Sequence, residues 1–185
     1  MQKNINFLIR WLQNFTSVGA FAPLGEDTNQ AIWNAIGTNV SFCPKHIVEL
    51  WWGIWNLTTN LLQFFPTSLV TTYEIQDSFI DSLKKLKKTY KNLRVKHKSW
   101  AAIADEKQAD VVVSTIPFTV LDKDEWSKIL MWAYKILKPY GVLIIVQYTW
   151  VFMKKFSDEL QHFSLISKQR ERDIFHPVTT ITTFR

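Results

Sequence analysis

Two glutamates stand where a side chain could meet a ligand. Glu49 lies in a predicted strand that runs into a turn and then a helix, and Glu74 ends a second predicted strand. Either residue alone would most simply be a solvated loop carboxylate. Their placement around a strand–turn–helix unit favours contacts with a cofactor instead. A carboxylate at the end of the second strand can accept hydrogen bonds from two hydroxyl groups at once.

The segment 114–118, Ser-Thr-Ile-Pro-Phe, is a second candidate for chemistry. It follows a predicted strand, so an ordinary strand-to-helix connection is the simpler interpretation, although we favour a functional loop. The four histidines have no spacing typical of metal ligands, and no metal site is predicted. The single cysteine, Cys43, cannot form a disulfide within the chain, which is typical of a reducing compartment.

The elements that position these residues follow from hydrophobic periodicity and turn residues. A helix-spaced apolar stripe predicts helices, and short β-branched runs predict strands. The predicted helices are 4–15, 27–36, 56–65, 76–90 and 123–137, the last stopped by a turn at 138–141. The predicted strands are 46–50, 69–73, 93–96, 110–114, 142–148, 163–168 and 178–184.

Alternating strands and helices predict an α/β fold, a doubly wound, Rossmann-like sheet of seven strands with helices on both faces. Strands 46–50 and 69–73 are expected to be parallel neighbours. The last two strands are close enough in sequence to form an antiparallel edge. The 185 residues suffice for one α/β domain at 38–185, preceded by a helical segment at 1–37 that could act as a lid or face a membrane.

This order of segments and their junctions resembles the class I methyltransferases that use S-adenosylmethionine. Family members have an acidic residue, an apolar residue and G-x-G-x-G in the first strand-to-helix turn, where this chain has Glu49, Leu50 and Trp-Trp-Gly-Ile-Trp at 51–55. Glu74 stands where the family binds the ribose hydroxyls, and 110–118 and 136–142 resemble the fourth-strand and L-K-P-G-G motifs. The resemblance implies a cofactor site formed by Glu49, Trp51, Gly53, Trp55, Glu74, Ile75, Ser99, Trp100 and Ser114. The region 99–101 departs from the family, which often has an acidic residue there.

Within the superfamily, the likeness is greatest to bacterial phospholipid N-methyltransferases. It rests on residues 15–23, the loop 114–118 and Gln-Tyr-Thr at 147–149. It implies methylation of a phospholipid amine, with Ser114, Thr115, Tyr148 and Tyr73 shaping the acceptor site and none of them assignable as a base. The open alternatives are an RNA adenine N-methyltransferase and a methyltransferase-like protein that is catalytically silent.

Basic side chains concentrate in the segment 84–98, which contains no acidic residue. It holds eight of the 22 basic residues of a chain whose net charge is +6. A solvated helix face is the simpler interpretation, and a surface for anionic lipid or nucleic acid is the functional one. No apolar run is long enough to span a bilayer, and no secretory signal is present. The expected location is cytoplasmic, with peripheral attachment to the inner membrane surface through the basic segment and the amphipathic helix 4–15.

Tryptophan and glycine have unusual frequencies. The chain has nine tryptophans and five glycines, and the two together would be an ordinary glycine content. Trp51, Trp52 and Trp55 fall in a turn whose backbone must approach the ligand closely, and indoles there would obstruct the cofactor. One hypothesis is a source that reads UGA as glycine and a gene translated as if UGA meant tryptophan. Deliberate substitution and a naturally inactive relative are the alternatives.

Overall fold

The computed structural model describes residues 24–40, 43–50, 55–74, 77–97, 109–116, 121–147, 159–171 and 179–185. The predicted helix 4–15 lies outside these residues, and the division of the chain at residue 37 stays a prediction.

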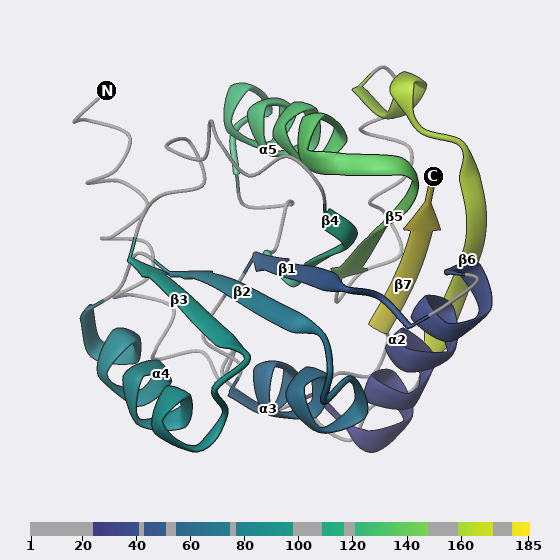
Figure 1. Cartoon of the computed structure of the whole chain (residues 1–185). Coiled ribbons are helices and arrows are strands. Elements are labelled where there is room, and N and C mark those ends of the chain that lie inside the picture. Colours follow the sequence, from purple (N-terminus) through teal and green to yellow (C-terminus); the bar gives the residue numbers. More distant parts are fainter. Residues whose placement is uncertain are drawn as a thin grey trace.

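Seven strands form one mixed sheet in the order β3-β2-β1-β4-β5-β7-β6. Their bounds are β1 His46–Leu50, β2 Leu69–Glu74, β3 Leu93–His97, β4 Ala109–Ser114, β5 Leu137–Gln147, β6 Leu165–Glu171 and β7 Thr179–Phe184. The pairs among β1 to β5 are parallel. Strand β7 runs antiparallel between β5 and β6 (Figure 1). The predicted fold class, the parallel pairing of β1 with β2 and the antiparallel edge are therefore confirmed.

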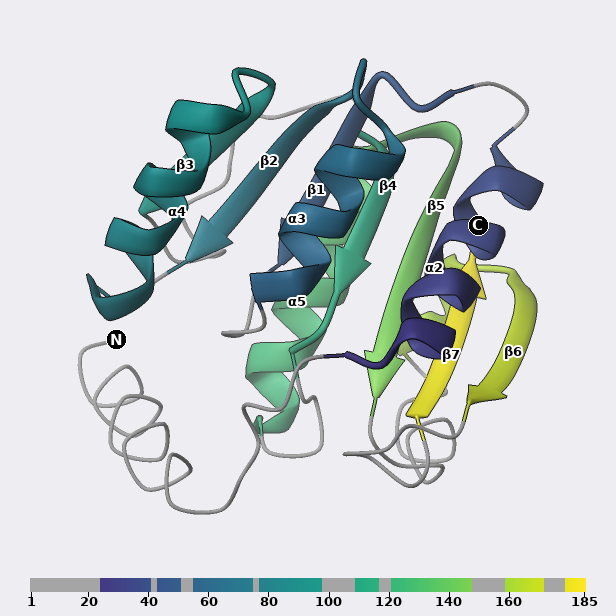
Figure 2. The ribbon, with the colours of Figure 1, turned by 90° about the horizontal axis from the view of Figure 1, so that it is seen from below.

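Helices cover both faces of the sheet, as predicted. Helix α5 (Lys123–Ile136) packs on one face, while α2 (Glu26–Asn39), α3 (Trp55–Phe64) and α4 (Asp77–Thr89) lie on the other (Figures 1 and 2). The central strands are buried on both sides, which explains their nearly continuous apolar sequences. A short 3-10 helix, η3 (Glu159–His162), precedes β6.

The start of β5 differs from the prediction. Pro139 and Gly141 indicated a turn at 138–141, but the structure assigns these residues to β5, which follows α5 directly. The register explains the difference. Ala109 pairs with Leu137 and Val111 with Val142, so the single residue Asp110 of β4 faces residues 138–141 of β5 as an irregular bulge.

Tyr140 lies in this bulge with a φ of 68°, in the left-handed region that favours glycine. Its side chain is 81% exposed, so its ring gains little from packing. We expect Tyr140→Gly to raise the free energy of unfolding by about 1 kcal/mol. A Cβ at the neighbouring Gly141 would lie 2.9 Å from Leu137 Cδ2 and 3.0 Å from the Lys138 carbonyl oxygen. Because these contacts are too close, Gly141→Ala should lower the free energy of unfolding. Urea unfolding of both variants tests these two expectations. A Tyr140→Gly variant less stable than the parent would contradict the expected relief of backbone strain.

Trp126 is the largest fully buried side chain among the described residues, with 1% of its surface exposed. It lies on α5 and belongs to the core cluster between that helix and the sheet. Trp132, on the same helix, is partly buried against this cluster and meets Tyr73 edge to face at 6.0 Å between ring centroids. The prediction that these two tryptophans are core residues is confirmed for Trp126, whereas Trp132 lies at the margin of the core.

Candidate cofactor site

The carboxyl ends of β1, β2 and β4 meet at one edge of the sheet, because the three strands are parallel neighbours. Glu49 pairs in register with Thr72 of β2 and with Val113 of β4, and Leu50 pairs with Ser114. Glu74 lies two residues beyond Thr72. The structure thus brings Glu49, Glu74, Ser114 and Thr115 to the same edge, where ligands bind in open α/β sheets.

Glu49 is completely buried on the side of the sheet that faces α3. Its Oε2 accepts two hydrogen bonds, from the hydroxyl of Thr58 on α3 at 2.7 Å and from that of Thr72 on β2 at 2.8 Å. Its Oε1 is buried and has no hydrogen-bond partner among the described residues. Burial raises the pKa of Glu49 from 4.5 to about 7, although both threonine hydroxyls act to lower it.

This raised pKa predicts a pH dependence of stability. The folded protein holds the Glu49 proton more tightly than the unfolded chain, so the stabilisation is fully present below about pH 4.5 and is lost as the pH rises through about 7. The difference between these pKa values corresponds to about 3 kcal/mol. We expect Glu49→Gln, which stays neutral, to flatten this part of the stability profile and to be more stable than the parent at pH 8. Urea unfolding between pH 4.5 and 8 tests this, and parallel profiles for the two proteins would contradict it.

Glu74 is also buried, with 3% of its surface exposed. It pairs in register with His97 at the end of β3. The imidazole Nε2 of His97 lies 3.5 Å from a carboxylate oxygen of Asp77 at the start of α4. Together these residues put polar groups around the ends of β2 and β3, and the role of Glu74 toward a ribose stays a prediction.

The end of β4 carries two hydroxyls at the same edge. The Thr115 N–H donates to the Leu50 carbonyl over 3.4 Å, which ties this position to the end of β1. The Thr115 Oγ1 is buried without a hydrogen-bond partner among the described residues. Gln147, at the end of β5, donates to the Ile116 carbonyl at 2.7 Å. Buried polar atoms normally have partners, so Thr115 Oγ1 and Glu49 Oε1 are two atoms that a ligand could satisfy.

Several predicted site residues lie outside the described part of the chain. They are Trp51, Gly53, Ile75, Ser99, Trp100 and Tyr148. Trp55 begins α3, and its side chain is not among those described. Their roles remain predictions.

Asp110 and Lys138 form a second polar centre, at the opposite edge of the sheet. The Asp110 carboxylate accepts from the backbone N–H groups of Lys45 and His46 at 2.8 and 2.9 Å and from Lys138 Nζ at 2.7 Å. Burial acts to raise the pKa of Asp110, but these hydrogen bonds and the charge of Lys138 outweigh it and hold the pKa below its usual value. The sequence motifs around 110 and 138 gave no sign of this contact.

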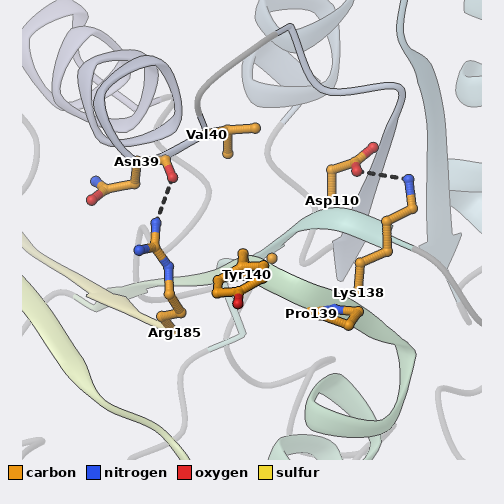
Figure 3. Close-up of a pocket in the computed structure, with 8 residues that line it drawn as sticks. Asn39, Val40, Asp110, Lys138, Pro139, Tyr140 and Arg185 are labelled. Atoms are coloured by element: carbon orange, nitrogen blue, oxygen red, sulfur yellow. Dashed lines mark hydrogen bonds and ion pairs between the residues drawn. The ribbon is translucent and has the colours of Figure 1, made fainter.

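A cavity of about 400 Å³ opens beside this pair, lined also by Arg185, Asn39 and Tyr140 (Figure 3). Arg185 donates to the Asn39 carbonyl at 2.6 Å, at the end of α2, whose last turn has no basic residue of its own. The head groups of both lining cations are therefore engaged by protein acceptors. We interpret this edge as structural, with Arg185 stabilising the C-terminus of α2.

Comparisons with known proteins identify the fold. No protein-family model matches the sequence, and no curated protein matches it significantly. Solved structures do match. The N-methyltransferase NodS from Bradyrhizobium japonicum, crystallised with S-adenosylhomocysteine, aligns with a TM-score of 0.70 at 10% identity, covering 86% of this chain and 85% of NodS.

Two further solved methyltransferase structures align with this chain over most of its length. The 1,6-didemethyltoxoflavin N1-methyltransferase of Burkholderia thailandensis, with its substrate and S-adenosylhomocysteine bound, aligns with a TM-score of 0.71 at 13% identity over 98% of this chain and 89% of that one. The glycopeptide N-methyltransferase MtfA aligns with a TM-score of 0.73 at 12% identity over 89% and 91%. This chain therefore has the fold of the class I methyltransferases.

Among the described residues, no group of three or more His, Cys, Asp or Glu side chains could hold a metal ion. Within the same residues, no helix is long and apolar enough to cross a bilayer.

Proposed function

We propose that this chain is an S-adenosylmethionine-dependent methyltransferase by fold and site, whose cofactor turn needs glycine at 51, 52 and 55 to bind S-adenosylmethionine. The observation that carries the proposal is the buried Glu49 carboxylate at the end of β1, whose Oε1 has no partner among the described residues and lies in the strand before the turn at 51–54. A buried charged oxygen without a partner is costly, and the ammonium group of a bound cofactor would compensate it. The fold shared with NodS, which binds S-adenosylhomocysteine, supports this proposal.

In this proposal, each part of the chain has a limited task. The bound cofactor supplies an electrophilic methyl group on its sulfonium. Glu49 and the turn at 51–55 hold the amino-acid part, and Glu74 with Ile75 holds the ribose and adenine. Ser99, Trp100 and Ser114 complete the cofactor site. Methyl transfer is an in-line displacement, so the main contributions of the protein are alignment and exclusion of water.

We further propose that the methyl acceptor is a phospholipid amine. The N-methyltransferase-like motifs at 15–23, 114–118 and 147–149 support this acceptor, and Ser114, Thr115 and Tyr148 would shape its site. Helix α4 contributes four exposed lysines, Lys84, Lys85, Lys87 and Lys88, of which Lys84 lies 3.4 Å from Asp81. This basic surface would attach the protein peripherally to the anionic inner face of a membrane.

A flotation experiment tests the membrane proposal. Binding to vesicles containing an anionic phospholipid should weaken with salt, and changing the four α4 lysines to glutamine should reduce it, because each lysine near the surface contributes about 1 kcal/mol. Removing residues 1–15 should also reduce it. Changing Lys123, Lys128 and Lys135, which are exposed on α5 across the sheet, is the control for the general loss of positive charge. Equal recovery with neutral and anionic vesicles would contradict the proposal.

An RNA adenine N-methyltransferase is the second candidate, because the same lysines could contact phosphates. Tight, salt-dependent RNA binding together with indifference to vesicle charge would favour it. The third candidate is a catalytically silent protein. Failure to bind S-adenosylmethionine even after Trp51, Trp52 and Trp55 are changed to glycine would favour it.

A further inference from the structure

Two threonines distant in sequence converge on one oxygen of Glu49. Thr58 lies on α3, nine residues after Glu49, and Thr72 lies on β2, twenty-three residues after it. Both are completely buried, and both hydroxyls donate to Oε2 and not to Oε1. The carboxylate is therefore held from the helix side and from the neighbouring strand at the same time.

This arrangement leaves one defined oxygen for a ligand. A glutamate side chain has three rotatable bonds, and fixing it costs conformational entropy that two hydrogen bonds can offset. With Oε2 occupied, Oε1 is the oxygen that can still accept. The geometry also joins the helix that follows the cofactor turn to the strand that carries Glu74.

We propose that Thr58 and Thr72 are positioning residues for the cofactor site, which hold Oε2 of Glu49 so that Oε1 receives the ammonium group of the cofactor. The inference rests on the proposed function, which it deepens by dividing the two carboxylate oxygens between the protein and the ligand. Neither threonine touches the reacting atoms in this account.

After burial, the two threonine hydroxyls are the groups that most affect the pKa of Glu49. Helix α3 has no ionisable side chain, and β4 places Val113 opposite Glu49. The nearest ionisable group on the same side of β2 is Glu74, two residues beyond Thr72. Removing either hydroxyl should therefore raise the pKa of Glu49 above its value of about 7, because each hydrogen bond favours the charged form.

A carbon-detected NMR titration of the Glu49 carboxyl group tests the arrangement in the protein without cofactor, with Glu49→Gln identifying the signal. We expect Thr58→Val and Thr72→Val each to raise the pKa of Glu49 by about 1. Thr58→Ser and Thr72→Ser keep the hydroxyl and should restore the parent value, and these milder variants serve if a valine variant does not fold. Thr71→Val is the matched control, because Thr71 is equally buried on the same strand but bonds His46 Nε2 at 2.9 Å.

Titration of S-adenosylhomocysteine into the protein with glycine at 51, 52 and 55 tests the cofactor role. Thr72→Val in that background should weaken binding about tenfold at pH 7, whereas Thr71→Val should not change it. An unchanged Glu49 pKa in the valine variants overturns the positioning role. If the valine variants do raise the pKa of Glu49 but the glycine protein does not bind S-adenosylhomocysteine, the proposed function is overturned, and with it the role of Oε1.

Discussion

Changing Trp51, Trp52 and Trp55 together to glycine is expected to raise the affinity for S-adenosylmethionine by at least about a hundredfold. A glycine-rich strand-to-helix turn binds its ligand through close approach of the backbone, and indoles at these positions would fill that volume or displace the turn. The parent chain should therefore bind weakly or not at all. Because glycine is a poor helix former, the start of α3 should lose some stability in exchange.

Isothermal titration calorimetry of the two proteins measures the effect. Trp33→Gly, on α2 and outside the turn, is the control and should leave affinity unchanged. Binding by the parent chain at ordinary micromolar affinity would overturn the steric argument. Failure of the glycine protein to bind would remove the main support for the enzyme assignment. Recovery of binding would favour glycine as the intended residue at these three positions.

Trp126→Ala should lower the free energy of unfolding by about 3–5 kcal/mol. The indole fills the core between α5 and the sheet and is 1% exposed, so its loss leaves a cavity as well as removing apolar burial. Met131→Ala, on the same helix but 41% exposed, is the control and should cost much less. Urea unfolding at one pH measures both.

The stability of Trp126 variants also tests whether tryptophan replaces glycine at this position. Trp126→Gly should be at least as destabilising as the alanine variant, because glycine adds a helix-propensity cost of about 1 kcal/mol. A glycine variant as stable as the parent would instead group Trp126 with the turn residues as a position where tryptophan replaces glycine. The structure shows that Trp126 fills the core, whereas glycine as the intended residue at 51, 52 and 55 stays a hypothesis that the binding experiment tests.

Local periodicity is sufficient to predict that the strands carrying Glu49 and Glu74 are parallel neighbours, because short β-branched runs alternating with amphipathic helices leave few topologies. It was insufficient at β5, where Pro139 and Gly141 favour a turn and the pairing of Ala109 with Leu137 extends the strand. At this position the pairing of β5 with β4 outweighs the turn preference of residues 138–141.

The sequence indicates the candidate site only in part, because local patterns show positions along the chain and not contacts between distant segments. Glu49 and Glu74 stand out in the sequence because each lies at the end of a strand that precedes a helix, and the structure brings them to one edge of the sheet. The sequence does not indicate Thr58 and Thr72, because their hydrogen bonds to Glu49 come from α3 and β2 and no spacing within either segment reveals them. The sequence indicates Asp110 only as the start of a strand and of the fourth-strand motif, because its three donors come from β5 and from the chain before and at the start of β1.

The hydrogen bonds of Asp110 have an evolutionary consequence. They fasten the starting ends of β1, β4 and β5 to one another, at the edge of the sheet remote from Glu49 and Glu74. The segments that follow the other ends of these strands can then change in length and sequence without unpairing the sheet. Such a scaffold lets these segments diverge while the fold persists. Two solved structures that share the fold at 12–13% identity are named for different molecules, 1,6-didemethyltoxoflavin and a glycopeptide.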